Sequence, residues 1–176
     1  MAIQFQPAVR RMAKLRMALA GVAGSGKTLT ALFIAKGMGG RIALVDTEAG
    51  SSTKYAGDPD VPHFDVVVLE SFHPQRYLDA IHAAEQAGYD ILILDGISQA
   101  WNGKDGILEL VETNRLKSRT GNAFSDGWRI ASPIHQQFMD GILQSPLHII
   151  ATLRTKQEYV LEERDGKKIP VKKGME

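Results

Sequence analysis

The sequence lacks cysteine altogether, and this absence excludes disulfide bonds, thiolate zinc sites and a cysteine nucleophile. It fits a reducing compartment, so we expect a cytoplasmic protein. An excess of charge is also lacking, because 21 lysines and arginines face 20 acidic residues for a net charge of +1. The sequence as a whole therefore has no bulk attraction to nucleic acid or to a membrane surface, and such binding would need a local patch.

Long hydrophobic runs are missing as well. No stretch approaches the ~20 apolar residues that a membrane helix needs, and residues 1–16 have no continuous apolar segment of the kind found in signal peptides. We therefore expect no contact with a membrane.

The histidines show no spacing that would assemble a metal site on one element, so we predict no transition metal. They stand at positions 63, 73, 82, 135 and 148.

What the sequence does contain is an alternation of strand-like and helix-like segments. In 176 residues, 44% of them hydrophobic, this pattern predicts one α/β domain with a mostly parallel, twisted sheet and helices on both faces. The predicted strands are 15–20, 41–46, 65–69, 91–94 and 147–153. The predicted helices are 27–38, a helix from Pro74 that Gly88 ends, 106–117, and a last one for which Ser132 is the N-cap and Pro133 the first residue.

Glycine, proline and polar residues mark the connections. Residues 47–62 are predicted to be a long surface loop, and residues 121–127 a second, polar loop. Two short apolar runs, 158–161 and 168–171, flank Asp165-Gly166, and this arrangement predicts a C-terminal β-hairpin.

The ends of the chain differ from its middle. We predict an N-terminal arm at residues 1–13, with a possible role in subunit contact, and one domain over residues 14–176. No helix or cap follows Gly174. We therefore expect the natural domain to continue further.

The most specific motif is Gly21-Val22-Ala23-Gly24-Ser25-Gly26-Lys27-Thr28, which fits G-x-x-x-x-G-K-[ST] at every fixed position. It lies between a predicted strand and a predicted helix, where backbone N–H groups and the helix N-terminus attract phosphate. We predict a nucleoside triphosphate with Mg²⁺, Lys27 on the β/γ-phosphate oxygens and Thr28 on the metal. The alternative is a glycine-rich turn with a surface lysine. The predicted nucleotide-binding residues are Gly21, Gly24, Ser25, Gly26, Lys27, Thr28 and Leu29.

Acidic residues follow two of the predicted strands. Asp95 closes the apolar run 91–94, and at the carboxyl end of a parallel strand it would share the Mg²⁺ site with Thr28. An acid in this place is also an ordinary turn residue, which is the alternative. Glu48 lies two residues beyond the strand end at Asp46 and has the reach to activate a water near the γ-phosphate. We predict that Asp46 is a turn residue or supports the site indirectly.

Four segments together resemble the RecA-like ATPases. They are residues 21–28, 45–51, 94–95 and 151–156. More closely, they are similar to phage nucleotide-binding proteins that include single-strand-annealing recombination ATPases, and the resemblance extends from Phe5 to Met175. It implies a RecA-like P-loop fold and Mg²⁺-dependent ATP hydrolysis, with Glu48 as catalytic base and Asp95 as the metal-binding acid. It also implies action on single-stranded DNA in phage recombination or annealing.

One departure from these proteins concerns the strand that carries their γ-phosphate-sensing glutamine. That strand matches 147–153, where this chain has no glutamine. Thr152, Arg154 and Lys156 are the candidates for the role. We predict that Arg154 is catalytic, either on its own nucleotide or on that of a neighbouring subunit. The alternative is that Arg154 and Lys156 are simply exposed charges before the hairpin.

Basic and aromatic residues around the polar loop mark a candidate contact with single-stranded DNA. Their mixture suits phosphate contact together with base stacking, and the alternative is a solvated loop. The residues are Arg115, Lys117, Arg119, Phe124, Trp128 and Arg129. A second basic run, of Lys167, Lys168, Lys172 and Lys173, also suits a hairpin edge that lysines protect from aggregation.

The N-terminal arm contains Phe5-Gln6-Pro7-Ala8. This F-x-x-A segment resembles the motif by which relatives of RecA add a short strand to the neighbouring subunit, so we expect a homo-oligomer. The alternative is that Phe5 folds back onto its own domain.

Two other functions fit the phosphate-binding motif. One is a P-loop kinase that phosphorylates a small molecule, and the other is a nucleotide-gated binding module with little turnover. A kinase would need an arginine-rich lid and an acceptor pocket. The predicted catalytic glutamate and hairpin favour hydrolysis instead.

Overall fold

The computed structural model describes residues 13–117, 123–155, 157–164 and 167–175, together with Phe5, Pro7 and Val9. For residues 123, 124, 157–164 and 167–175 it describes the backbone alone.

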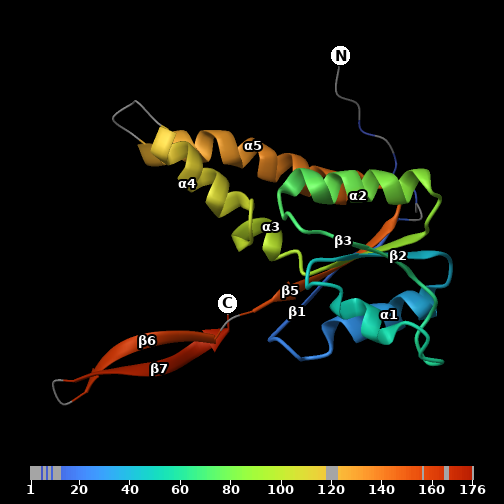
Figure 1. Ribbon diagram of the computed structural model, residues 1–176, viewed down its shortest axis with the longest axis horizontal. Helices are drawn as coiled ribbons and strands as arrows, with labels where there is room; N and C mark the ends of the chain where they lie inside the picture. Colours follow the sequence, from blue (N-terminus) through green and yellow to red (C-terminus); the bar gives the residue numbers. More distant parts are fainter. Residues whose placement is uncertain are drawn as a thin grey trace.

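A sheet of five parallel strands forms the centre of the molecule, with the order β1-β5-β4-β2-β3. The strands are β1 (Arg16–Gly21), β2 (Ile42–Asp46), β3 (Asp65–Val68), β4 (Ile91–Asp95) and β5 (His148–Arg154). Helix α1 (Lys27–Met38) covers one face, and α2 (Pro74–Gln86) and α5 (Ala123–Gln144) cover the other (Figure 1). The predicted α/β architecture and all five predicted strands are confirmed, with strand bounds that shift by one residue.

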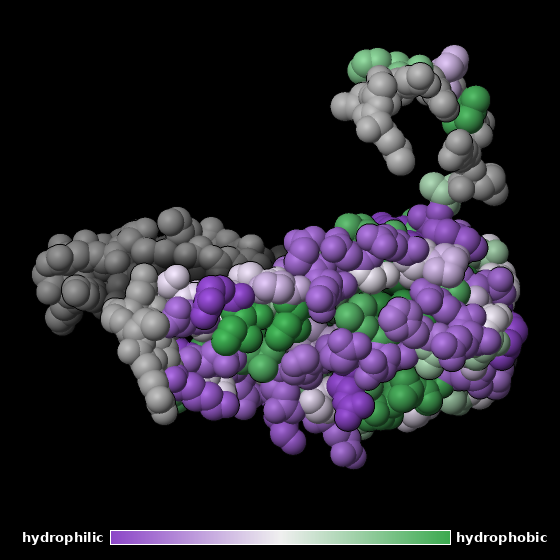
Figure 2. All heavy atoms as spheres, turned by 90° about the horizontal axis from the view of Figure 1, so that it is seen from above, coloured by the Kyte–Doolittle hydropathy of each residue, from purple (hydrophilic) through white to green (hydrophobic). Residues whose placement is uncertain are grey.

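Two apolar cores explain why the central strands hold their positions. Every residue of β2 and β4 is buried. Ile91 and Ile93 point to the core beneath α1, whereas Leu92 and Leu94 point to the core beneath α2 and α5. A strand that is apolar on both faces is typical of a parallel sheet between two helical layers. The outer surface on the α2 and α5 side is mostly polar, with apolar side chains gathered in a few places (Figure 2).

The register of the strands determines what meets at their carboxyl ends. Asp46 on β2 lies opposite Asp95 on β4, and Gly21 on β1 lies opposite Arg154 on β5. Because all five strands are parallel, these residues share one rim of the sheet. In open parallel sheets this rim is where ligands bind.

The predicted loop at 121–127 is wrong for residues 123–127, which belong to α5. Ser132 and Pro133 do not open a helix, since Pro133 lies inside α5. Packing on α4 (Ile107–Lys117) explains the difference. A Cβ atom at Gly127 would lie 2.5 Å from the carbonyl oxygen of Val111, so this glycine permits close helix contact and does not mark a turn.

Two short helices were not predicted. The 3₁₀ helix η1 (Ser51–Tyr55) interrupts the predicted loop after β2, and α3 (Gln99–Asn102) follows β4. The predicted hairpin is confirmed as β6 (Gln157–Arg164) and β7 (Lys167–Met175), which project from the end of β5 (Figure 1). Asp165 and Gly166 lie outside the described residues. Among the helices that the structure describes, none is long and apolar enough to cross a membrane.

Candidate functional site

The phosphate-binding loop connects β1 to α1. Gly24 and Gly26 have φ values of 76° and 80°, a left-handed conformation that glycine adopts without strain. A Cβ atom at either position would meet no atom within 4 Å, so the loop is open on that side. Within α1, whose residues are all described, no acidic side chain stands in the first turn and no side chain caps the N-terminus. Its free N–H groups are therefore available to an anion.

Lys27 and Thr28 begin α1 and face different partners. Lys27 Nζ donates to the carbonyl oxygen of Val22 at 2.8 Å, which keeps the ammonium group over the loop. Thr28 Oγ1 donates to Asp95, at 2.8 Å from Oδ2 and 3.1 Å from Oδ1. The structure thus brings together the two residues predicted to bind Mg²⁺, although 67 positions separate them in the sequence.

Asp95 is buried, with 3% of its surface exposed. Burial raises the pKa of its carboxyl group; hydrogen bonds from Thr152 and Thr28 act against this rise, and the charges of Glu48 and Asp46 add to it. Among the described residues, the carboxylate accepts hydrogen bonds from two hydroxyl groups, those of Thr28 and Thr152. Its hard oxygen atoms beside the hydroxyl of Thr28 are ligands of the kind that Mg²⁺ prefers, together with phosphate oxygens.

Asp46 is also buried, but its carboxylate is fully engaged by the loop that follows it. Oδ1 accepts from the backbone N–H groups of Glu48 at 2.7 Å and Gly50 at 3.2 Å. Oδ2 accepts from the backbone N–H of Ser52 at 2.8 Å and from its hydroxyl at 2.5 Å. Burial raises the pKa of Asp46, yet these bonds outweigh it and the net shift is downward. Asp46 holds the loop, which agrees with its predicted role as a turn residue.

Glu48 and Arg154 form an ion pair across a polar pocket of about 270 Å³. Arg154 Nη2 lies 2.6 Å from Glu48 Oε1, and both side chains are partly exposed. Gly96, Ser98, Gln99 and Asn102 complete the lining of this pocket. A carboxylate and a guanidinium group thus face a water-accessible space at the same rim as the phosphate-binding loop.

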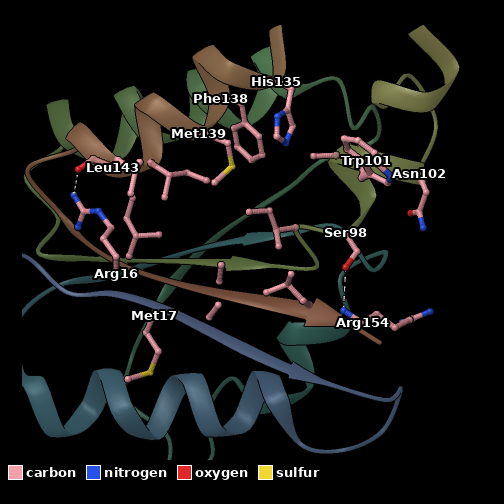
Figure 3. A pocket seen from close by; sticks show the side chains of 17 residues that line it. Arg16, Met17, Ser98, Trp101, Asn102, His135, Phe138, Met139, Leu143 and Arg154 are labelled. Atoms are coloured by element: carbon pink, nitrogen blue, oxygen red, sulfur yellow. Dashed lines mark hydrogen bonds between the residues drawn. The ribbon is translucent and has the colours of Figure 1, made fainter. Parts of the chain in front are cut away.

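A larger, mostly apolar groove of about 700 Å³ adjoins this pocket. Ser98 and Arg154 lie at one end of it, where the backbone N–H of Arg154 donates to Ser98 Oγ at 3.0 Å (Figure 3). Trp101, His135 and Phe138 line the helical wall, and the Trp101 ring packs edge-on against His135. Arg154 therefore connects the polar pocket with the groove.

One family model matches residues 13–175, almost the whole chain, and its description is an AAA domain. The chain belongs to this family. No curated protein matches the sequence. An AAA domain is a nucleotide-binding domain of the P-loop type, in agreement with the loop geometry and the five-stranded parallel sheet.

The other predicted nucleotide-binding residues of the AAA domain lie around the same loop. Gly21 ends β1, and its carbonyl oxygen accepts from the N–H of Thr155. A Cβ atom at Gly21 would lie 2.7 Å from Ser25 Oγ, so the two residues are in close contact. The side chain of Leu29 packs against the core beneath α1, which leaves only its backbone for a ligand. Among the described residues there is no cluster of three His, Cys, Asp or Glu side chains that could hold a metal.

Two residues that position the AAA-domain site carried no distinct signal in the sequence. Thr47 Oγ1 donates to the carbonyl oxygens of Asp95 and Gly96, at 2.8 Å and 3.1 Å. A Cβ atom at Gly96 would collide with this hydroxyl. Ser98 supports the backbone at Arg154, as described above. These contacts join segments far apart in the chain, and only the parallel register brings them together.

The residues predicted to contact DNA or other subunits differ in what surrounds them: some pack or pair within the domain, and one is fully exposed. Arg115 pairs with Glu112 on its own helix at 2.6 Å. Trp128 packs between α4 and α5 and contacts Trp101, with 5.9 Å between ring centroids, so it takes part in the packing of the domain. Phe5 is 99% exposed. Arg119, Lys156 and the side chains of Phe124 and the hairpin lysines lie outside the description.

Proposed function

We propose that this AAA domain is a Mg²⁺-dependent ATPase of the RecA-like type that acts on single-stranded DNA in phage recombination or annealing. One observation carries the ATPase part. Lys27, Thr28, Asp95 and the Glu48–Arg154 pair, which come from four separate segments, converge on one rim of the sheet. The DNA part is supported by the resemblance to phage recombination ATPases and by the basic residues near 115–129.

In the proposed hydrolysis, each of these residues has a separate role. The open N–H groups of the loop and Lys27 bind and orient the triphosphate, while Thr28 and Asp95 would hold Mg²⁺. When bound, the metal ion neutralises charge on the β- and γ-phosphate oxygens. Glu48 accepts the proton of the attacking water. Because Arg154 binds Glu48 in this structure, an incoming γ-phosphate competes for the arginine and frees the carboxylate to act as a base.

Replacement of Glu48 by Gln tests the hydrolytic step. We expect Glu48→Gln to bind a fluorescent ATP analogue normally but to release phosphate about 10²-fold more slowly, the scale of general-base loss. Glu112→Gln is a matched control, since Glu112 also forms an ion pair with an arginine at 2.6 Å, on the surface of α4. Equal turnover of Glu48→Gln and the wild type would place the base elsewhere.

Phosphate release with and without a single-stranded oligonucleotide tests the DNA part. We expect the oligonucleotide to raise the rate. If the rate of hydrolysis is the same with and without the oligonucleotide, the proposed action on DNA is contradicted and the ATPase assignment is unaffected. Nucleotide binding without hydrolysis under either condition would favour the nucleotide-gated binding module, and transfer of the γ-phosphoryl group to a small molecule would favour the kinase.

A further inference from the structure

A second threonine donates to the carboxylate of Asp95, and it comes from the neighbouring strand β5. Thr152 lies on β5 and is 1% exposed. Its hydroxyl donates to Asp95 Oδ1 at 2.6 Å and accepts from the backbone N–H of Gly96 at 2.8 Å. Because the N–H of Gly96 can only donate, the single hydroxyl proton is directed at the carboxylate.

Because Thr152 is buried, it does not fit the role of γ-phosphate sensor, for which the sequence made it one of three candidates. Its hydroxyl is enclosed between β4 and β5, whereas Arg154, two residues further along β5, reaches the polar pocket beside Glu48. Thr152 therefore binds the carboxylate of Asp95, whereas Arg154 faces the polar pocket.

Thr28, Thr47 and Thr152 each bind a different part of Asp95. Thr47 fixes the backbone, because its hydroxyl donates to the carbonyl oxygen of Asp95 at 2.8 Å. Thr152 holds Oδ1 from one side, and Thr28 lies nearest to Oδ2. The side-chain torsion of an aspartate carboxylate is otherwise broad. A threonine is well suited to restrict it, since branching at Cβ limits the rotamers of its own hydroxyl.

We propose that Thr152 is a positioning residue for the metal-binding acid: it holds the carboxylate of Asp95 so that Oδ2 and the hydroxyl of Thr28 face the Mg²⁺ ion that accompanies the nucleotide. This inference rests on the proposed function, because it requires a metal ion at Asp95. Hydrogen-bond partners of metal ligands typically contribute 10–100-fold to metal affinity. The role assigned to Thr152 is of this kind.

Thr152→Val and Thr152→Ser test the proposal. Valine keeps the branched shape and removes the hydroxyl, whereas serine keeps the hydroxyl. Two measurements apply: the Mg²⁺ concentration that gives half-maximal binding of a fluorescent ATP analogue, and Mn²⁺ binding in the presence of ADP by electron paramagnetic resonance. We expect Thr152→Val to raise the half-saturating metal concentration by about 10-fold or more. Thr152→Ser should restore most of this loss, and binding of the analogue without metal should change little in either variant.

Ser145→Ala is the matched control. Ser145 also has a buried hydroxyl that donates to a carboxylate, Glu85 Oε1, at 2.6 Å and accepts from a backbone N–H, that of Leu147. It lies beyond the end of α5, away from Asp95. Its loss should lower the melting temperature without moving the metal dependence, which separates a positioning role from a general loss of stability.

The outcomes distinguish this inference from the proposed function. If binding of the ATP analogue by the wild type does not depend on metal, the proposed function and the inference are both overturned. If the wild type binds metal but Thr152→Val has the same metal dependence, only the role of Thr152 is overturned. Should Thr152→Val not fold, Thr152→Ala removes the same hydroxyl with a smaller side chain, and an unchanged metal dependence there counts equally against the proposal.

Discussion

The strands β2 and β4 end in aspartates that lie directly opposite each other, yet these two ends of the sheet are built differently. Asp46 receives three backbone N–H groups and one hydroxyl, all from the loop that follows it. Asp95 receives two hydroxyls, from α1 and β5. Both side chains are buried, but the pKa of Asp46 is lowered and that of Asp95 is raised.

The source of the hydrogen-bond donors decides what a buried carboxylate can do. Backbone N–H groups of one tight loop are fixed dipoles, and they stabilise the charge of Asp46 without any ligand. Hydroxyls that come from other elements stabilise the charge of Asp95 only in part. Asp46 therefore holds the loop that carries Glu48, whereas Asp95 is the acid that we propose to bind the metal ion.

The largest difference between the two aspartates is expected from Asp95→Asn. We expect it to raise the Mg²⁺ concentration for half-maximal nucleotide binding at least ~10-fold, since the loss of even an indirect partner of a metal ligand has this cost. The melting temperature should not fall, because the amide oxygen can accept from Thr152, the hydroxyl of Thr28 can reorient toward the amide nitrogen, and the buried charge is removed. A variant with the metal dependence of the wild type would remove Asp95 from the metal site.

Asp46→Asn should show the opposite pattern. The N–H groups of Glu48, Gly50 and Ser52 cannot reorient, so an amide nitrogen would face donors, and we expect a loss of about 1–3 kcal/mol in the free energy of unfolding. Urea denaturation measures this loss. The Mg²⁺ concentration for half-maximal nucleotide binding should stay unchanged. If that concentration rises as much as in Asp95→Asn, the two strand ends do not have separate roles.

The smallest effect concerns acid stability. A carboxylate with a lowered pKa in the folded state contributes stability that is present above its unfolded pKa of about 3.9 and is lost as the pH falls through the folded pKa. In the wild type, the free energy of unfolding should therefore decrease below about pH 4. Asp46→Asn should show a shallower decrease there. Parallel curves for the two proteins would show that Asp46 gains no stabilisation of its charge.

Much of this site follows from the sequence, because its signals are local. The loop 21–28 has a fixed spacing, and the apolar runs before Asp46 and Asp95 locate the rim. The pairing of Glu48 with Arg154 spans 106 positions, and the roles of Thr47 and Thr152 depend on which strands become neighbours. No periodicity in the sequence specifies those neighbours.

The wrong predictions have the same origin. Gly127 and Pro133 favour a turn and a helix start by local rules. Packing against Val111 and the apolar side of α4 overrides these rules, and one helix runs through both positions.

The most direct test of the account is the affinity of the wild type and of Lys27→Ala for a fluorescent ATP analogue, with and without Mg²⁺. Lys36→Ala is the control, because Lys36 lies on the same helix and its ammonium group donates to the carbonyl oxygen of Asp60, away from the phosphate-binding loop. We expect Mg²⁺-dependent binding in the wild type and in Lys36→Ala, and an affinity about 10–100-fold weaker in Lys27→Ala, the scale of a lost hydrogen bond between charged groups. Equal affinities of the wild type and Lys27→Ala would contradict the assignment of the triphosphate to this loop.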